Sequence, residues 1–286
     1  TIDQDLVDLQ IAERLAISLR QERAQPTSPP SASRPCKEVH TRDANSGSGT
    51  SVAVARYKED TAWTDALRSQ GLNVTVRDAS EGRDETIAFV RHLIDSFDDS
   101  NASMHVFLHG GSPNDWHSPD GLVDYIGEVN PAKVNSVLGG YASLNHPYMG
   151  DPESAQHKLL EYRIDCSWRD DPWVKQMKSH WALKDFGAFS GLAGRYCCSQ
   201  FVLTQEALHT FPKAFYQSLL ERVSMHEPWE HKSWKTIGRT MAMIWHTMFT
   251  GKVTEPKYKY ETIANCPSSG CHAKRPVRRA AHAAPV

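Results

Sequence analysis

The segment Met104–His117, MHVFLHGGSPNDWH, constrains the fold more than any other part of the chain. From Met104 to Leu108 apolar residues occupy both alternating sets of positions, which is the pattern of a strand buried on both faces of a sheet. The pair Gly110–Gly111 forces a turn directly after His109. Because ligands of open α/β sheets bind at the carboxyl ends of strands, we expect a polar site there. The alternative is that His109 only hydrogen-bonds to the turn.

Strands and helices are predicted to alternate around this segment. The further strands are expected at Ser51–Ala55, Asn73–Val76 and Cys198–Leu203, and the first and last of these, or one of them, should flank Met104–Leu108. A helix beginning near Asp84 carries apolar residues on one face, namely Ile87, Val90, Ile94 and Phe97. This alternation predicts an α/β fold with a mostly parallel or mixed central sheet flanked by helices.

The composition divides the chain into a folded part and two polar ends. With 286 residues, 40% of them hydrophobic, the chain can bury a full core. We expect a short amphipathic helix in residues 1–23, a disordered linker rich in Pro, Ser and Gly in 24–50, and a basic disordered tail in 273–286. A single α/β domain is expected between them, in residues 51–272.

Charge and hydropathy exclude some classes of partner. The formal net charge of −2 gives no long-range attraction to nucleic acid or to an anionic membrane. No stretch reaches the roughly 18 consecutive apolar residues of a membrane span. The sequence starts at Thr1, so an upstream targeting segment remains compatible with it and the secretory pathway stays open as a location. The oligomeric state is also left open.

The cysteines do not form a complete metal motif. Cys197 and Cys198 lie in an apolar run and are expected to be small buried hydrophobes. Cys266 and Cys271, followed by His272, have the spacing of half a zinc site, but no second pair at finger spacing accompanies them. A local disulfide is the other interpretation, and the one we favour.

A helix near the C-terminus places two chemical groups together. At about 100° per residue, one face gathers the apolar residues Ile237, Met241, Ile244 and Met248. Arg239 and His246 point to the opposite face. We expect this face to be solvated unless another part of the protein covers it.

Six sequence segments together resemble an uncharacterised family, domain of unknown function 3431 (DUF3431), from about Ser51 to Cys271. In chain order they are VARYKEDTAW (54–63), FLHGGSPNDWH (107–117), YRIDCSW (162–168), CCSQFVLTQEAL (197–208), GRTMAMIWHTMF (238–249) and CPSSGC (266–271). Each segment alone is a weak signal, but their number, order and spacing make the resemblance fairly specific.

This family is in turn similar to the GT-A glycosyltransferases, at a greater distance. The resemblance implies a nucleotide-sugar site at the carboxyl end of a mostly parallel sheet. Arg56 or Arg239 would bind the donor phosphates, and Glu59 or Asp60 would contact the base or ribose. Gln200 and Trp116 complete the expected substrate contacts. His109, His246 and Arg239 are the expected catalytic groups, and a divalent cation such as Mn²⁺ would be bound by His109, Asp115 and His117.

The chain departs from these relatives at several positions. The Asp-x-Asp metal motif of GT-A enzymes is missing, and Asp98–Asp99 precede the strand instead of following it. The resemblance places a glutamate where this chain has Ala242, between Arg239 and His246, so a carboxylate that would orient the histidine is lost. The expected second cysteine after YRIDCSW is also absent, which leaves Cys166 without a local partner.

Three functional hypotheses follow. The first is a transferase that uses a nucleotide-linked sugar donor, with Arg56, His109, His117 and His246 bordering one pocket. The second is a ligand-binding or scaffold protein that kept the fold without the chemistry. The third is a non-sugar transferase, because a fold does not fix a reaction. For Glu59 and Asp60, capping of the helix predicted at 61–67 is an equally good explanation.

Overall fold

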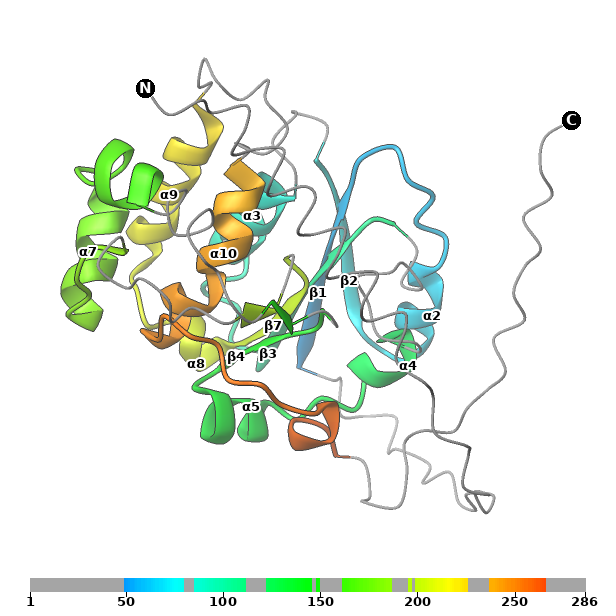
Figure 1. Ribbon diagram of the computed structural model, residues 1–286. Helices are drawn as coiled ribbons and strands as arrows, with labels where there is room; N and C mark the ends of the chain where they lie inside the picture. The colour runs from blue at the N-terminus through cyan, green and yellow to red at the C-terminus, as the bar shows by residue number, and fades with distance from the viewer. Residues whose placement is uncertain are drawn as a thin grey trace, which may run out of the picture.

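The computed structural model describes residues 49–79, 85–111, 122–145, 148–149, 161–186, 195–196, 199–225 and 237–265. The main element is a five-stranded sheet with the order β2-β1-β3-β7-β4 (Figure 1). Its strands are β1 (Thr50–Arg56), β2 (Asn73–Asp78), β3 (Met104–His109), β4 (Tyr141–Ser143) and β7 (Phe201–Thr204). A separate two-stranded sheet pairs β5 (Tyr148–Met149) with β6 (Arg195–Tyr196).

The sheet is mixed. β1 pairs in parallel with β2 on one side and with β3 on the other, and β7 runs antiparallel to both β3 and β4. β3 therefore lies between β1 and β7, which confirms the predicted central strand and its two neighbours. The strand expected at Cys198–Leu203 is observed only as Phe201–Thr204, since Ser199 and Gln200 precede it without strand geometry.

Helices cover both faces of the sheet (Figure 1). The apolar residues of β1 and β3 alternate: Val52, Val106 and their neighbours belong to one core cluster, and Ala53, Phe107 and theirs to the other. The first cluster is covered by α2 (Thr64–Ser69), α4 (Leu122–Ile126) and α5 (Pro131–Leu138). The second is covered by α3 (Thr86–Asp95), α7 (Pro172–Trp181), α8 (Gln205–Leu208), α9 (Lys213–Ser224) and α10 (Ile237–Thr250). The protein is thus an α/β fold with three layers.

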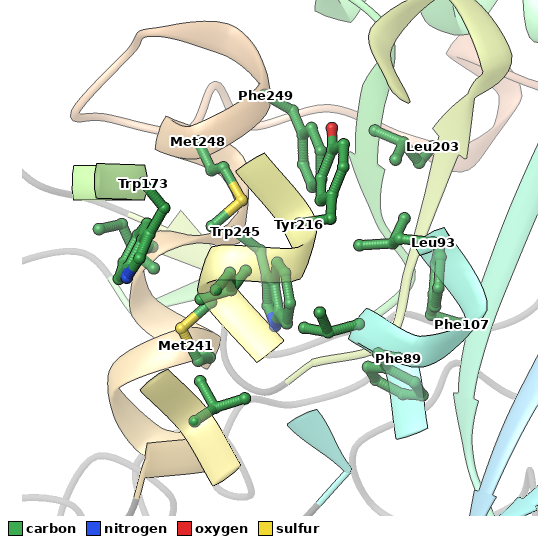
Figure 2. Close-up of a cluster of buried hydrophobic side chains, with 14 of the residues drawn as sticks. Phe89, Leu93, Phe107, Trp173, Leu203, Tyr216, Met241, Trp245, Met248 and Phe249 are labelled. Carbon is green, nitrogen blue, oxygen red and sulfur yellow. The ribbon is translucent and has the colours of Figure 1, made fainter. Parts of the chain in front are cut away.

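Aromatic side chains fill the second cluster (Figure 2). Phe107 of β3 stacks on Phe201 of β7 with ring centroids 4.5 Å apart, and Trp245 of α10 lies 5.3 Å from Phe201. Phe89 of α3 meets Phe107 edge to face at 5.2 Å. Such pairs contribute about 0.5–1.5 kcal/mol each beyond the area that they bury. The apolar face predicted for α10 is confirmed, since its four members are buried: Ile237, Met241, Ile244 and Met248.

Three further elements, α5, a π-helix and a 3₁₀ turn, were not expected from periodicity. α5 begins at Pro131, and the side chain of Asn130 caps it by accepting hydrogen bonds from the amides of Ala132 and Lys133. The helix ends before Gly139, whose φ of 74° is left-handed. A π-helix spans Glu161–Ser167, and a 3₁₀ turn spans Tyr260–Thr262. Cys166 of the π-helix is exposed and free.

No helix among the described residues is long and apolar enough to cross a membrane.

The expected terminal helix (1–23), all but the last two residues of the expected linker (24–50) and the expected basic tail (273–286) lie outside the described residues. β1 begins at Thr50, one residue before the expected domain boundary.

A buried histidine pair joins α3 to β3. His92 and His105 are 2% and 0% exposed, and their ring centroids are 5.5 Å apart. Burial, and after it the charges of His105 and Arg77, lowers the pKa of His92 from 6.5 to about 3. Burial also lowers the pKa of His105, although its hydrogen bond to Gln205 opposes the effect. Both imidazoles are therefore neutral in the folded protein at neutral pH.

This pair predicts acid sensitivity of the fold. Because the folded-state pKa of His92 lies below the unfolded value, the unfolded chain binds the extra proton, so stability is fully present above the unfolded pKa and is lost as the pH falls. We expect the free energy of unfolding to drop by about 1.4 kcal/mol per pH unit below about pH 6 from His92 alone. Urea denaturation across this pH range measures the slope.

The matched variants are His92→Gln and His180→Gln. The first replaces the buried imidazole by a group that does not titrate, so its pH slope should be shallower than that of the wild type. The second changes an exposed histidine of α7 and should keep the wild-type slope. Equal slopes in all three proteins would show that His92 does not control acid sensitivity.

Candidate functional site

The candidate site lies at the carboxyl edge of the sheet, which we define by the last residues of β1, β2 and β3, namely Arg56, Asp78 and His109. The chain crosses from β1 to β2 through α2 on one face and from β2 to β3 through α3 on the other. The boundary between β1 and β3 is therefore a topological switch point, where α/β proteins bind ligands.

The loops that follow β1 and β3 are held together at this point. Trp63 donates a hydrogen bond from Nε1 to the Gly110 carbonyl at 3.1 Å. A Cβ atom on Gly110 would lie 2.7 Å from the Ala55 carbonyl oxygen and 2.8 Å from the Arg56 Cα. Since both of these are backbone atoms, only glycine allows the two loops to approach so closely. The glycine after His109 thus serves close packing as well as the turn.

The loop after β1 has a constrained backbone. The Glu59 carboxylate accepts a hydrogen bond from the Tyr57 amide, and Lys58 between them has a φ of 64°. Positive φ is uncommon for residues other than glycine, and such positions concentrate at functional sites. Asp60 accepts from the Ala62 amide at 2.9 Å, in the turn that leads into α2. Both carboxylates thus bond to backbone amides of this loop, but neither caps α2, whose N-terminus has no side-chain cap.

Arg56 forms an ion pair across the edge. Its Nη2 and Nε atoms donate to Asp78 Oδ1 at 2.7 and 2.9 Å. The two side chains are 41% and 61% exposed, and a pair this exposed contributes at most about 1 kcal/mol. The guanidinium group can therefore leave Asp78 for a stronger anion at little cost.

His109 has polar neighbours on two sides. Its backbone amide donates to Gln200 Oε1 at 3.3 Å. Its Nε2 atom lies 3.8 Å from Glu85 Oε1, which belongs to the residue before α3. Glu85 makes no side-chain bond to the first amides of that helix, so capping does not account for the position of its carboxylate. Sequence reasoning missed Glu85, although a helix that follows β2 has to begin at the carboxyl edge.

Gln200 bridges the ends of two strands. While its Oε1 atom accepts from His109, its Nε2 atom donates to Asn145 Oδ1 at 3.2 Å, just beyond β4. Asn145 in turn donates from Nδ2 to the Gln200 carbonyl at 3.1 Å. Both side chains are 4% exposed. The structure therefore places Gln200 at the predicted edge, as a residue that positions the backbone of His109.

Two buried hydroxyl groups lie near these residues and were also missed. Thr86 Oγ1, in the first turn of α3, and Ser199 Oγ, beside Gln200, are buried and have no hydrogen-bond partner among the described residues. Buried hydroxyls normally find a partner, so such groups are candidates for contact with a ligand or a water molecule. Neither residue carries a sequence signal, because a single Ser or Thr next to a strand or helix is common.

The two groups expected on α10 have different surroundings from each other. Arg239 is exposed, but His246 is only 3% exposed and donates from Nε2 to the Val253 carbonyl at 2.9 Å. The segment after α10 folds back over its last turn, which explains why the opposite face of the helix is not solvated there. His246 lines a small cavity whose lining includes neither Arg56 nor His109.

The remaining predicted site residues, Asp115, Trp116 and His117, lie outside the described residues. Within the described ranges, no group of three or more His, Cys, Asp or Glu residues is placed to hold a metal ion. His109 and Glu85 are a neighbouring pair of potential ligands.

The bridge made by Gln200 predicts a stability effect. Gln200→Ala leaves the His109 amide and Asn145 Oδ1 without their partners in a buried site, so the free energy of unfolding should fall by about 2–4 kcal/mol. Gln176→Ala, on the exposed side of α7, is the control and should change stability by less than about 0.5 kcal/mol. Urea denaturation of the two variants compares them. Equal stabilities would mean that the bridge is energetically unimportant.

Comparison with known proteins identifies the family. The model of a family described as "Protein of unknown function (DUF3431)" matches residues 50–270, which is well over half of the chain. The match begins at the first residue of β1 and continues past the last described residue. No curated protein and no solved structure matches the chain significantly. The chain therefore belongs to the DUF3431 family.

Proposed function

We propose that the carboxyl edge binds a nucleotide-linked sugar and that the protein is a glycosyltransferase-like transferase. The observation that carries the proposal is the meeting of the β1 and β3 ends at the switch point, tied together by Trp63 and Gly110. Phosphate-containing ligands of open α/β sheets bind at such points. The resemblance to GT-A enzymes supplies the reaction class.

The charges at the edge suit the expected chemistry. In glycosyl transfer, positive charge develops on the sugar and negative charge on the departing diphosphate. Arg56 ends β1 at the switch point and would exchange Asp78 for a phosphate oxygen, since its present ion pair is exposed and weak. His109 would contact the reacting end of the donor, because it ends the central strand at the switch point, where Gln200 bonds its backbone amide.

A divalent cation is less well supported. Mn²⁺ and Mg²⁺ need several oxygen or nitrogen ligands. Two of the three expected ligands, Asp115 and His117, lie outside the described residues, and within the described part of the chain His109 has Glu85 as a neighbouring carboxylate. The pair His109 and Glu85 alone is too few ligands for a metal site. We therefore assign no step of the reaction to a metal.

A second candidate function is ligand binding without turnover. It is favoured by the engagement of the polar residues with one another: Arg56 with Asp78, Glu59 with the Tyr57 amide, and Asp60 with the Ala62 amide. The helix carrying Arg239 and His246 also has Ala242 in place of the glutamate that the resemblance implies. A protein that only binds its ligand needs the polar groups of the carboxyl edge but no general base.

Thermal-shift measurements test the proposal. Unfolding of the full chain is followed with nucleotide sugars, free nucleotides and free sugars, each with and without Mn²⁺. A ligand at about 100 times its dissociation constant stabilises the fold by about 2.7 kcal/mol, which raises the Tm by about 5 °C or more. A flat response to every nucleotide ligand contradicts both candidate functions. Stabilisation without hydrolysis or transfer of the sugar supports the second.

Two arginine variants locate the binding site. Arg56→Met should lose most of the nucleotide-dependent shift, because the phosphate then lacks its cation. Arg68→Met is the matched control, since Arg68 pairs with Asp65 at 2.8 Å on the exposed side of α2 in a similar ion pair. It should keep the full shift. If Arg56→Met also keeps it, the phosphates bind elsewhere.

His109→Ala tests the end of β3 in the same assay. It should abolish the nucleotide-dependent shift while the Tm of the free protein stays close to that of the wild type, since the side chain is 31% exposed. An unchanged ligand response would remove His109 from the site.

A further inference from the structure

β2 is the open edge of the five-stranded sheet. It pairs with β1 in an unbroken register along its whole length, and no other strand among the described residues pairs with its outer side. The opposite edge is short and covered: β4 has three residues, and Tyr258 of the segment after α10 donates its hydroxyl proton to the Ser143 carbonyl. An open strand edge is a template for pairing with a further strand.

The backbone groups on the outer side of β2 can be assigned from the register. Directly after the last pair, Arg56 with Asp78, the Ala79 amide donates to the Arg56 carbonyl at 2.7 Å. Along an edge strand, residues alternate between bonding to the neighbouring strand and pointing away from it. The odd-numbered residues of β2 therefore bond to β1, whereas Val74, Val76 and Asp78 direct their amide and carbonyl groups outward.

β2 lacks the features that commonly keep an open edge from pairing, which are proline, a β-bulge, or lysine and other free charges. Its sequence, NVTVRD, contains neither proline nor lysine, and the unbroken register with β1 leaves no place for a bulge. Its two charged residues are paired within the chain: Arg77 lies 2.7 Å from Asp95, and Asp78 lies 2.7 Å from Arg56. Neither charge acts as a free lysine would against an approaching strand.

Apolar surface remains at this edge. Val74 and Val76 pack against the core cluster that α2 covers, but both are only half-buried. Val52 of β1 and Val106 of β3 belong to the same cluster and are 0% exposed, since each has a paired strand on both sides. A strand that paired with β2 would cover Val74 and Val76 in the same way, and the burial of this apolar surface favours the pairing.

We propose that β2 pairs with β2 of a second copy of this chain, in antiparallel direction about a two-fold axis at Thr75. Residues with outward backbone groups then face each other in hydrogen-bonded pairs, with Val74 opposite the partner's Val76. Thr75 lies opposite the partner's Thr75, and Asn73 opposite the partner's Arg77. Cross-strand pairs of apolar residues and of threonines are favourable, and no like charges face each other in this register.

The self-complementary sequence favours a second copy over a strand of another protein. The next register that brings outward groups together is centred on Val76, and it would place Val74 opposite the partner's Asp78, an apolar side chain against a carboxylate. Two-fold pairing uses the open edge of each copy, and β4 is covered at the other edge, so the assembly closes as a dimer. The dimer is independent of the proposed transferase function.

Sedimentation velocity of the full chain tests the proposal. The protein is measured from about 1 µM to about 500 µM, a range that spans the affinities of small interfaces. We expect a reversible equilibrium between monomer and dimer, with no larger species. A monomer at every concentration would overturn the proposal and leave the edge to a strand of another protein. Growth into larger species would overturn it as well, because the two-fold pairing leaves no open edge.

Two charged variants test the position of the axis. Thr75→Lys places two ammonium groups opposite each other and Thr75→Glu two carboxylates, so each variant alone should be monomeric. An equal mixture should dimerise, since a lysine then faces a glutamate, and this rescue also shows that both variants are folded. Thr210→Lys, at a threonine after α8 that is half-buried like Thr75, should dimerise as the wild type does. Dimers of either Thr75 variant alone, or a monomeric mixture, would overturn the two-fold pairing.

Amide hydrogen exchange of the wild type, followed by NMR, locates the interface without any substitution. The amides of Val74 and Val76 point outward, so they should exchange fast in dilute protein and become protected as the concentration rises. The amides of Thr75 and Arg77 bond to β1 and should be protected at every concentration. A dimer in which the amides of Val74 and Val76 stay unprotected would place the interface elsewhere and overturn the proposal.

Discussion

Burial of β3 on both faces is the constraint on which the rest of this structure depends. Val106 and Phe107 point to opposite faces and are both 0% exposed, so each face requires its own layer of helices. Both long edges of β3 are also paired, with β1 on one side and β7 on the other. Only its carboxyl end is left to approach solvent. The position of His109 therefore follows from the burial of both faces and the pairing of both edges of β3. Its neighbours are the residues that the strand order brings to the carboxyl edge of the sheet.

The parts of the fold that local periodicity determines were predictable. β1, β2, α3 and the apolar face of α10 follow from residues close together in the sequence, as does the central place of β3. β4 was not predicted, because three residues are too few to show a period. α5 depends on a cap at Asn130 and a glycine at its end more than on an apolar face. The antiparallel direction of β7 follows from its pairing with β3, almost 100 residues earlier in the chain, and is invisible in a local pattern.

The same distinction applies to the candidate site. Arg56 and His109 could be placed at one edge because each directly follows a predicted strand, whereas Gln200 lay inside a predicted strand and was assigned to the site by the resemblance alone. Glu85 could not be paired with His109 in advance, since the length and path of the connection after β2 decide where its carboxylate lies. The burial of His246 is determined by the return of the chain over α10, which the helix sequence does not encode. Periodicity assigns a side chain to a face, and tertiary contacts decide what covers that face.

The insertion of β7 between β3 and β4 sets the order in which the sheet can assemble. β1, β2 and β3 form a contiguous parallel unit. β4 has no partner among them and can pair only after β7, residues 201–204, has been synthesised. During synthesis, β3 consequently keeps an open, apolar edge until more than 90 further residues have left the ribosome. Long-range pairing of this kind slows folding and exposes strand edges to other chains. Recombinant production of this protein should therefore profit from chaperones and slow expression more than its stability alone would suggest.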